Sequence, residues 1–129
     1  MTDGNGLSVA ILADDLIWAT RLASIARLAG ADGVVVGTDE RFAAALDQAD
    51  GAIVDLSVRG ASALDGIVAA ARAGIPVIAV GPHDDTAARK RALDAGASRV
   101  YAYRKLFEDG PRTIAIWLGL PEPFVAVGR

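Results

Sequence analysis

The feature that most constrains the fold of this chain is a regular alternation between short apolar runs and longer alanine-rich segments. Five of the runs are apolar at nearly every position, as expected for strands covered on both faces. They are Ser8 to Ala13, Gly33 to Val36, Ala52 to Val54, Pro76 to Val80 and Arg99 to Tyr103. Because helical segments with short connections separate these runs, the pattern predicts a parallel sheet with helices on both faces.

The segments between the runs have helical periodicity. Over residues 15–29 an apolar residue recurs at every third or fourth position from Trp18 onwards, which predicts that Trp18 packs in the core. Further helices are predicted over residues 61–73 and 86–95. The last helix is expected to start late, with Pro111 in its first turn, because the first turn tolerates proline.

Composition limits both the organisation of the chain and the kinds of partner it takes. With 129 residues, 53% of them apolar, one domain over residues 1–120 is expected, followed by a tail or linker at 121–129. Thirteen basic against sixteen acidic residues argue against direct binding of nucleic acid. Because no apolar stretch could span a bilayer and no signal peptide is recognisable, the chain is expected in the cytoplasm, without membrane contact. The absence of cysteine excludes disulfides and thiolate metal sites.

Three carboxylates fall at the ends of predicted strands. Asp14 and Asp15 follow the first strand, and Asp55 follows the third. In the strand order 2-1-3-4-5, the carboxyl ends of the first and third strands lie at the crevice where such sheets bind ligands. Carboxylates held close together repel one another unless a cation lies among them, and Mg²⁺ prefers carboxylate oxygens. The sequence therefore predicts a magnesium site, with helix capping and solvated charges as the alternative for these three residues.

The chain resembles the receiver domains of bacterial two-component response regulators over residues 8 to about 118. The resemblance rests on Ala10-Ile-Leu-Ala-Asp-Asp15, Ala52-Ile-Val-Asp55, Asp65-Gly66, Ile75-Pro-Val-Ile-Ala-Val-Gly81 and Ala95-Gly-Ala-Ser98. It implies a flavodoxin-like doubly wound (βα)5 sandwich and a role in phosphorelay signalling.

The resemblance also implies roles for particular residues. Asp55 would accept a phosphoryl group, and Mg²⁺ would be held by Asp14, Asp15, Asp55 and the backbone carbonyl of Ser57. The implied partners are a histidine kinase, a phosphotransfer protein or an effector. At most the chain would be a phosphoacceptor that dephosphorylates itself, not an enzyme acting on other substrates.

Two positions depart from the family pattern. Gly81 stands where the family has serine or threonine, so the hydroxyl contact to a phosphoryl oxygen is missing. An ungapped alignment places Tyr103 where the family has lysine, whereas a two-residue insertion would place Lys105 there. Both registers put the residue on the same face of a strand, so both remain open. These departures predict an atypical receiver that either accepts a phosphoryl group on Asp55 or is degenerate and acts through protein contacts.

Another function on the same fold is also considered, because a fold does not determine a function. A flavodoxin-like domain that binds a small ligand or cofactor, or an enzyme, would share this architecture. The turn after the first strand, residues 13–18, contains no glycine, so the dinucleotide-binding and P-loop patterns are absent.

Basic residues are concentrated in the last third of the chain. We expect a partner surface on the fourth helix, the fifth strand and the fifth helix, where an aromatic residue accompanies the positive charge. Its predicted members are Arg89, Lys90, Arg91, Arg99, Tyr101 and Arg104. A homodimer through this face is also possible on the sequence, and a solvated charged face is the alternative.

Overall fold

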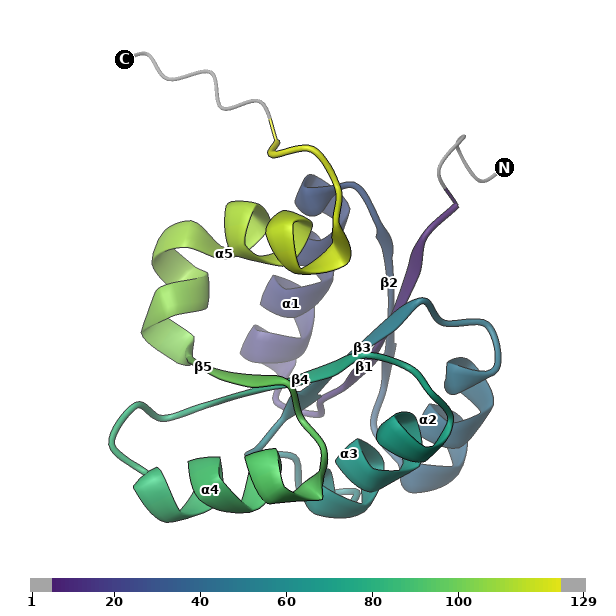
Figure 1. Cartoon of the computed structure of the whole chain (residues 1–129), viewed down its shortest axis with the longest axis vertical. Coiled ribbons are helices and arrows are strands. Elements are labelled where there is room, and N and C mark those ends of the chain that lie inside the picture. The colour runs from purple at the N-terminus through teal and green to yellow at the C-terminus, as the bar shows by residue number, and fades with distance from the viewer. Residues whose placement is uncertain (1–5, 124–129) are drawn as a thin grey trace.

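The computed structural model describes residues 6–123, which form a five-stranded sheet with helices on both faces (Figure 1). Neighbouring strands are parallel, and their order is β2-β1-β3-β4-β5. The strands are β1 (Ser8–Leu12), β2 (Asp32–Val36), β3 (Gly51–Asp55), β4 (Val77–Gly81) and β5 (Arg99–Ala102). The predicted fold class and strand order are therefore confirmed.

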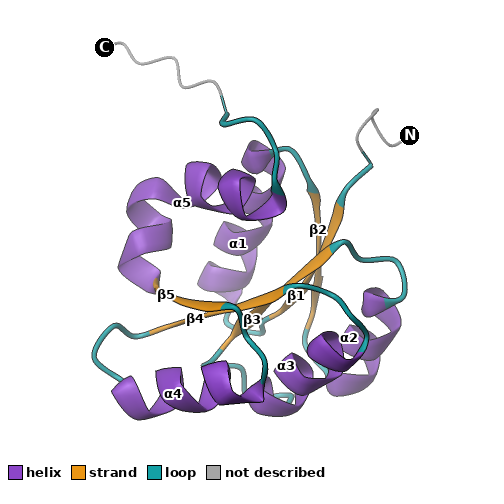
Figure 2. Ribbon diagram, viewed as in Figure 1, coloured by secondary structure: helices purple, strands orange, loops and turns teal. Residues whose placement is uncertain are grey.

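The helices form two layers (Figure 2). One layer contains α1 (Leu16–Ala29) and α5 (Tyr103–Leu118), and the other contains α2 (Asp39–Leu46), α3 (Ala63–Arg72) and α4 (Thr86–Ala95). Strand side chains alternate between the layers. Ile11 and Ile53 belong to the apolar cluster under α1 and α5, whereas Leu12 and Val54 belong to the cluster under α2 and α3. The sheet is thus covered on both faces, as its apolar strands require.

The ends of the helices follow their sequence signals. Asp15 caps α1 and Asp85 caps α4, each accepting a hydrogen bond from a backbone N–H three residues later. Gly30 ends α1 with φ 106° and Gly96 ends α4 with φ 126°, a backbone region that favours glycine. These local signals place the connections at the two rims of the sheet.

The junction of β5 and α5 differs from the expectation. Strand β5 ends at Ala102, and Tyr103 is already the first residue of α5. The prediction of a late start for this helix was therefore wrong. A kink at Asp109, whose φ is −145°, divides the helix, and Pro111 stands in the first turn after the kink. The proline signal correctly indicated a helix start, but a preceding helical segment joins it.

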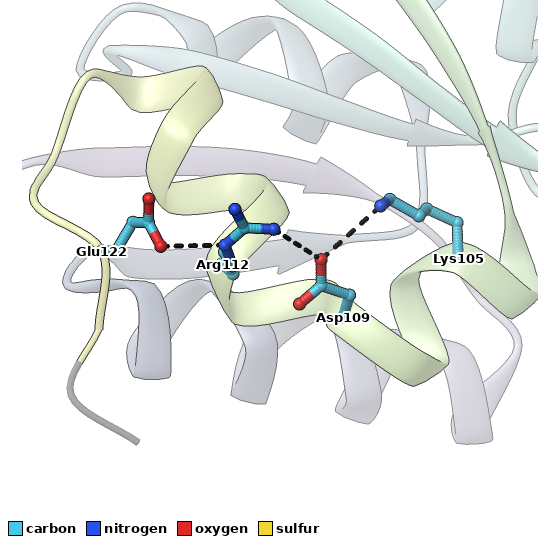
Figure 3. A network of polar contacts seen from close by, with 4 residues as sticks. All are labelled: Lys105, Asp109, Arg112 and Glu122. Carbon is cyan, nitrogen blue, oxygen red and sulfur yellow. Dashed lines mark hydrogen bonds and ion pairs between the residues drawn. The ribbon is translucent and has the colours of Figure 1, made fainter.

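Polar contacts accompany this kink (Figure 3). Asp109 lies 3.5 Å from both Lys105 and Arg112, and Arg112 donates a 2.8 Å hydrogen bond from Nε to Glu122. Of the predicted tail at 121–129, residues 121–123 are described, and Glu122 is held to α5 by this contact. Residues 124–129 lie outside the described part of the chain. No helix within residues 6–123 is long and apolar enough to cross a membrane.

Candidate functional site

The three carboxylates predicted from the sequence lie at the carboxyl ends of adjacent strands. Asp14 and Asp15 follow β1, and Asp55 is the last residue of β3. Strands β1 and β3 pair directly, with Leu12 opposite Val54. The sheet therefore brings the three residues to one rim, but each side chain has a different environment.

Asp55 is completely buried, with 0% of its surface exposed. Its Oδ1 atom accepts hydrogen bonds from the Ser57 backbone N–H (3.0 Å), the Ser57 hydroxyl (2.9 Å) and the Tyr103 hydroxyl. The two hydroxyl oxygens are themselves 3.1 Å apart. One carboxylate oxygen is thus fully engaged by the neighbouring loop and by the start of α5.

The second oxygen of Asp55, Oδ2, is also buried, and it has no hydrogen-bond partner among the described residues. A buried polar atom without a partner costs roughly 1–3 kcal/mol. The hydrogen bonds on Oδ1 help to offset this cost. The carboxylate is consequently a closed site, in which one oxygen is occupied and the other is shielded from solvent.

Tyr103 is the residue that closes this site. Burial raises the pKa of the Tyr103 hydroxyl well above its usual range, and the hydrogen bond to Asp55 raises it further. The hydroxyl therefore stays protonated and remains a donor at neutral pH. The Tyr103 ring packs on Trp18 of α1, with ring centroids 4.6 Å apart. This contact between the two rings stabilises the position of the Tyr103 hydroxyl.

Asp14 is exposed and accepts hydrogen bonds from the backbone. Its carboxylate accepts from the N–H groups of Arg59 (3.0 Å) and Gly60 (2.6 Å). Gly60 approaches so closely that a Cβ atom there would lie 2.8 Å from the Gly37 carbonyl oxygen. Asp14 thereby fixes the long loop between β3 and α3 against the end of β2.

Asp15 is exposed and serves as the N-cap of α1, with its Oδ1 accepting a 2.9 Å hydrogen bond from the Trp18 N–H. The capping role weighed for this residue is therefore present in the structure. The first turn of α1 that Asp15 fixes carries Trp18, the residue on which Tyr103 packs. Its cap thus supports the closed site indirectly.

The predicted magnesium site needs a space that the three carboxylates share. A cleft of about 570 Å³ is lined by Asp14, Asp15, Leu16, Ser57 and Arg59, and Asp55 lies outside its lining. Within residues 6–123, no group of three or more acidic, histidine or cysteine side chains is arranged to hold a metal ion.

The bonding of these groups leads to the same result. Mg²⁺ requires several oxygens in near-octahedral geometry, whereas here Asp14 and Asp15 bind backbone N–H groups and Asp55 binds Ser57 and Tyr103. Among the buried side-chain oxygens of the described residues, Oδ2 of Asp55 is the one without a hydrogen-bond partner. The residues as arranged do not fit the ion.

Gly81 and Lys105 complete the set of positions singled out by sequence. Gly81 ends β4, and a Cβ there would lie 3.0 Å from Cδ1 of Leu56, so Leu56 occupies the space where a side chain at position 81 would begin. Lys105 is paired with Asp109 on α5 (Figure 3). Tyr103, and not Lys105, lies against Asp55.

The predicted partner surface is only partly free. Arg89 is half-buried and donates a 2.8 Å hydrogen bond to the Val100 carbonyl of β5. Lys90 and Arg104 form ion pairs with acids one helical turn away, and Arg91 and Arg99 are exposed. The aromatic member, Tyr101, is half-buried and packs against the core cluster.

Three contributors to the site were not predicted from the sequence. They are the backbone N–H groups of Arg59 and Gly60 and the side chain of Leu56. The available signal was the loop that follows Asp55, since the backbone groups of a loop need hydrogen-bond partners.

Comparison with solved structures shows which fold this is. A putative response regulator from Chloroflexus aurantiacus has a TM-score of 0.76 and 18% identity, covering 88% of this chain and 98% of its own. A response regulator receiver protein from Burkholderia phymatum has a TM-score of 0.69 and 24% identity, covering 92% and 99%. A response regulator from Burkholderia pseudomallei, described with a phosphorylated aspartic acid, a calcium ion and citrate, has a TM-score of 0.67 and 15% identity, covering 88% and 71%.

No protein-family model matches the sequence, and no curated protein matches it either. The similarity is therefore one of fold. The chain has the fold of response regulator receiver domains, which confirms at that level the resemblance indicated by its motifs.

Proposed function

We propose that this chain is a cytoplasmic signalling domain of the receiver type that acts through protein contacts and does not use Asp55 as a phosphoacceptor. The observation that carries the proposal is the environment of Asp55, which is buried, with one oxygen bonded to Tyr103 and Ser57 and the other shielded. Phosphoryl transfer depends on positioning an accessible nucleophile in line with the donor. A closed carboxylate does not meet that requirement.

The electrostatics around Asp55 support the same conclusion. Phosphoryl transfer needs cations or other donors that stabilise charge on the transferring group. Here a neutral hydroxyl, Tyr103, faces Asp55, and Lys105, the alternative position for the family's lysine, is paired with Asp109 on the surface of α5. Gly81 provides no hydroxyl, and Leu56 fills the space beside it.

Phosphorylation of Asp55 with a bound Mg²⁺ ion is the competing proposal, and it requires rearrangement at each carboxylate. Asp14 would have to exchange its hydrogen bonds to Arg59 and Gly60 for metal coordination. Asp55 would have to lose its bond to Tyr103 to expose an oxygen. The two proposals therefore differ in whether Tyr103 leaves Asp55.

The decisive experiment is incubation of the chain with a small phosphodonor such as phosphoramidate and excess Mg²⁺, followed by intact-mass measurement. We expect no added phosphoryl group. A mass increase that disappears in the Asp55→Asn variant would show that Asp55 is a phosphoacceptor and would overturn the proposal. Tyr103→Lys, which places the family's cation at this position, tests the role of Tyr103, with Tyr101→Lys on β5 as the matched control.

The contact surface is proposed to be the basic face of α4, β5 and α5, where it would receive an acidic protein partner. Arg91 and Arg99 are exposed there, and neither forms an ion pair within the described residues. Exposed charges at an interface rim mainly affect association rate and salt dependence. Arg91→Glu is therefore expected to lower salt-sensitive binding to a partner without altering Tm, whereas Arg72→Glu on α3 is expected to leave binding unchanged.

A further inference from the structure

We infer that two copies of this chain pair through strand β2, which forms an open edge of the sheet (Figure 2). Strand β2 is bonded to β1 on one side only. The Asp32 N–H donates to the Leu7 carbonyl, and the Val36 carbonyl accepts from the Ala13 N–H. Asp32, Val36 and the residue midway between them therefore direct their backbone groups towards β1.

The two intervening residues, Gly33 and Val35, direct their backbone groups the other way. Within residues 6–123 no strand pairs with them on that side. A row of unpaired N–H and C=O groups is a template for another strand. The side chains at this edge do not prevent pairing, because glycine and valine are uncharged.

The opposite edge of the sheet, β5, is a useful contrast. Residues 76 and 80 direct their carbonyl groups towards β3, so Ala79 directs its backbone groups towards β5, between Arg99 and Tyr101. The outward residue of β5 is therefore Val100. The Val100 carbonyl already accepts a hydrogen bond from Arg89 of α4, which places a positive charge along this edge. Like charges brought together along β5 oppose pairing with a second copy, and charged residues are a usual protection of sheet edges. Self-pairing is therefore favoured at β2.

Apolar surface flanks the β2 edge on both faces of the sheet. Val34, on the face of α2, is 44% exposed, and Val35, on the face of α1, is 39% exposed. A groove of about 690 Å³ runs between β2 and α1, and Leu16, at the start of α1, is 81% exposed. In the middle of the groove α1 presents only small side chains, including Thr20 and Ala23. A second helix can approach closely there.

The register of the pair follows from the backbone alternation. In an antiparallel pair related by a two-fold axis, Gly33 of one copy and Val35 of the other exchange backbone hydrogen bonds. Val34 then lies on the axis, opposite Val34 of the second copy. Because Val34 makes no hydrogen bond across this edge, it forms a close pair with Cα atoms roughly 4.5 Å apart.

Charge complementarity selects a second copy as the occupant of this edge. Helix α1 runs antiparallel to β2, so the two-fold axis places the end of one α1 beside the start of the other. Arg27, near the end of α1, lines the groove and has no ion pair within the described residues. Asp15, at the start of α1, carries the opposite charge. Each copy therefore presents both halves of the pair, as a self-complementary interface requires.

The test uses the absence of cysteine from the chain. A Val34→Cys variant places one thiol per copy on the proposed axis, at a separation that a disulfide can span. The matched control is Leu93→Cys on α4, which replaces a residue of similar exposure, 43%, on the basic face. Under mild oxidation we expect the Val34→Cys variant to form a disulfide-linked dimer at least tenfold faster than the control.

A second measurement, sedimentation, tests the dimer without a cysteine substitution, so it applies even if cross-linking alters the fold. Sedimentation of the unmodified chain is expected to show a concentration-dependent dimer, and Val35→Lys is expected to shift it to monomer, because lysine protects sheet edges. Equal cross-linking of the two cysteine variants, or a chain that stays monomeric at every concentration, would overturn the inference. Faster cross-linking of Leu93→Cys would also overturn it and would place the dimer on the face of α4. This inference does not depend on the state of Asp55.

Discussion

Asp14 and Asp55 stand at the ends of neighbouring strands and have the same side chain, but the structure uses them differently. Asp14 is exposed and accepts hydrogen bonds from backbone N–H groups of a loop. Asp55 is buried, and two of its three donors are side-chain hydroxyls. The partners of Asp14 survive most substitutions in the loop, whereas those of Asp55 depend on the identity of Ser57 and Tyr103.

This difference separates structure from activity at the rim of the sheet. A backbone-bonded carboxylate holds a loop in place whatever the chemistry nearby. A carboxylate bonded to side chains is opened or closed by single substitutions, and here the two hydroxyls close it. The strand ends alone bring the acids together, but the residues around each acid decide whether it can react.

The largest expected effect on stability concerns the buried carboxylate, Asp55. Tyr103→Phe removes one donor from Asp55 while keeping the ring that packs on Trp18. We expect a loss of about 2 kcal/mol in the free energy of unfolding, since hydrogen bonds to charged groups are among the stronger ones. Urea unfolding measures it, and Tyr101→Phe is the control. A loss equal to that of the control would show that the contact contributes nothing.

The next largest effect concerns the exposed carboxylate, Asp14. Asp14→Ala leaves the N–H groups of Arg59 and Gly60 to water, which is expected to cost roughly 1.5 kcal/mol or less. Amide hydrogen exchange in the loop should become faster, while exchange in the strands should stay slow. Asp84→Ala, an exposed acid in another loop, is the control. Unchanged exchange at both amides would contradict the role given to Asp14.

A smaller effect is expected at Asp15, which is exposed like Asp14 and caps the helix that carries Trp18. Asp15→Ala removes the N-cap of α1 and should cost about 1 kcal/mol, whereas Asp15→Ser keeps a capping oxygen and should cost less. Thermal unfolding of the two variants separates capping from charge. Equal losses in both would assign the effect of Asp15 to its charge instead.

The smallest effect is a dependence on alkaline pH. Because the folded state raises the pKa of Tyr103, its contribution to stability is complete below the usual tyrosine pKa of about 10 and is lost as pH rises further. The stability difference between the unmodified chain and Tyr103→Phe should therefore be constant at neutral pH and narrow above about pH 10. Urea unfolding across this range measures the difference, and a stability difference that widens above about pH 10 would contradict a raised pKa of Tyr103 in the folded state.

The sequence predicted the sheet better than it predicted the site. Apolar runs and the capping residues Asp15 and Gly30 are local signals, so strands, helices and their order followed from them. The closure of Asp55 depends on Tyr103, 48 residues away in the chain, and on the exact end of β5. Sequence spacing left positions 103 and 105 equivalent, and they are distinguished by the hydrogen bond of Tyr103 to Asp55 and by the packing of its ring on Trp18.

The central claim, that Tyr103 closes Asp55, is tested most directly by Trp18 fluorescence during titration with Mg²⁺ and beryllofluoride, a phosphoryl mimic. Trp18 lies against Tyr103, so any movement of the tyrosine away from Asp55 changes the surroundings of the indole. The account predicts no saturable change in the unmodified chain. A saturable response that requires both Mg²⁺ and the mimic, and that is lost in Asp55→Asn, would show that the site opens and would contradict the account.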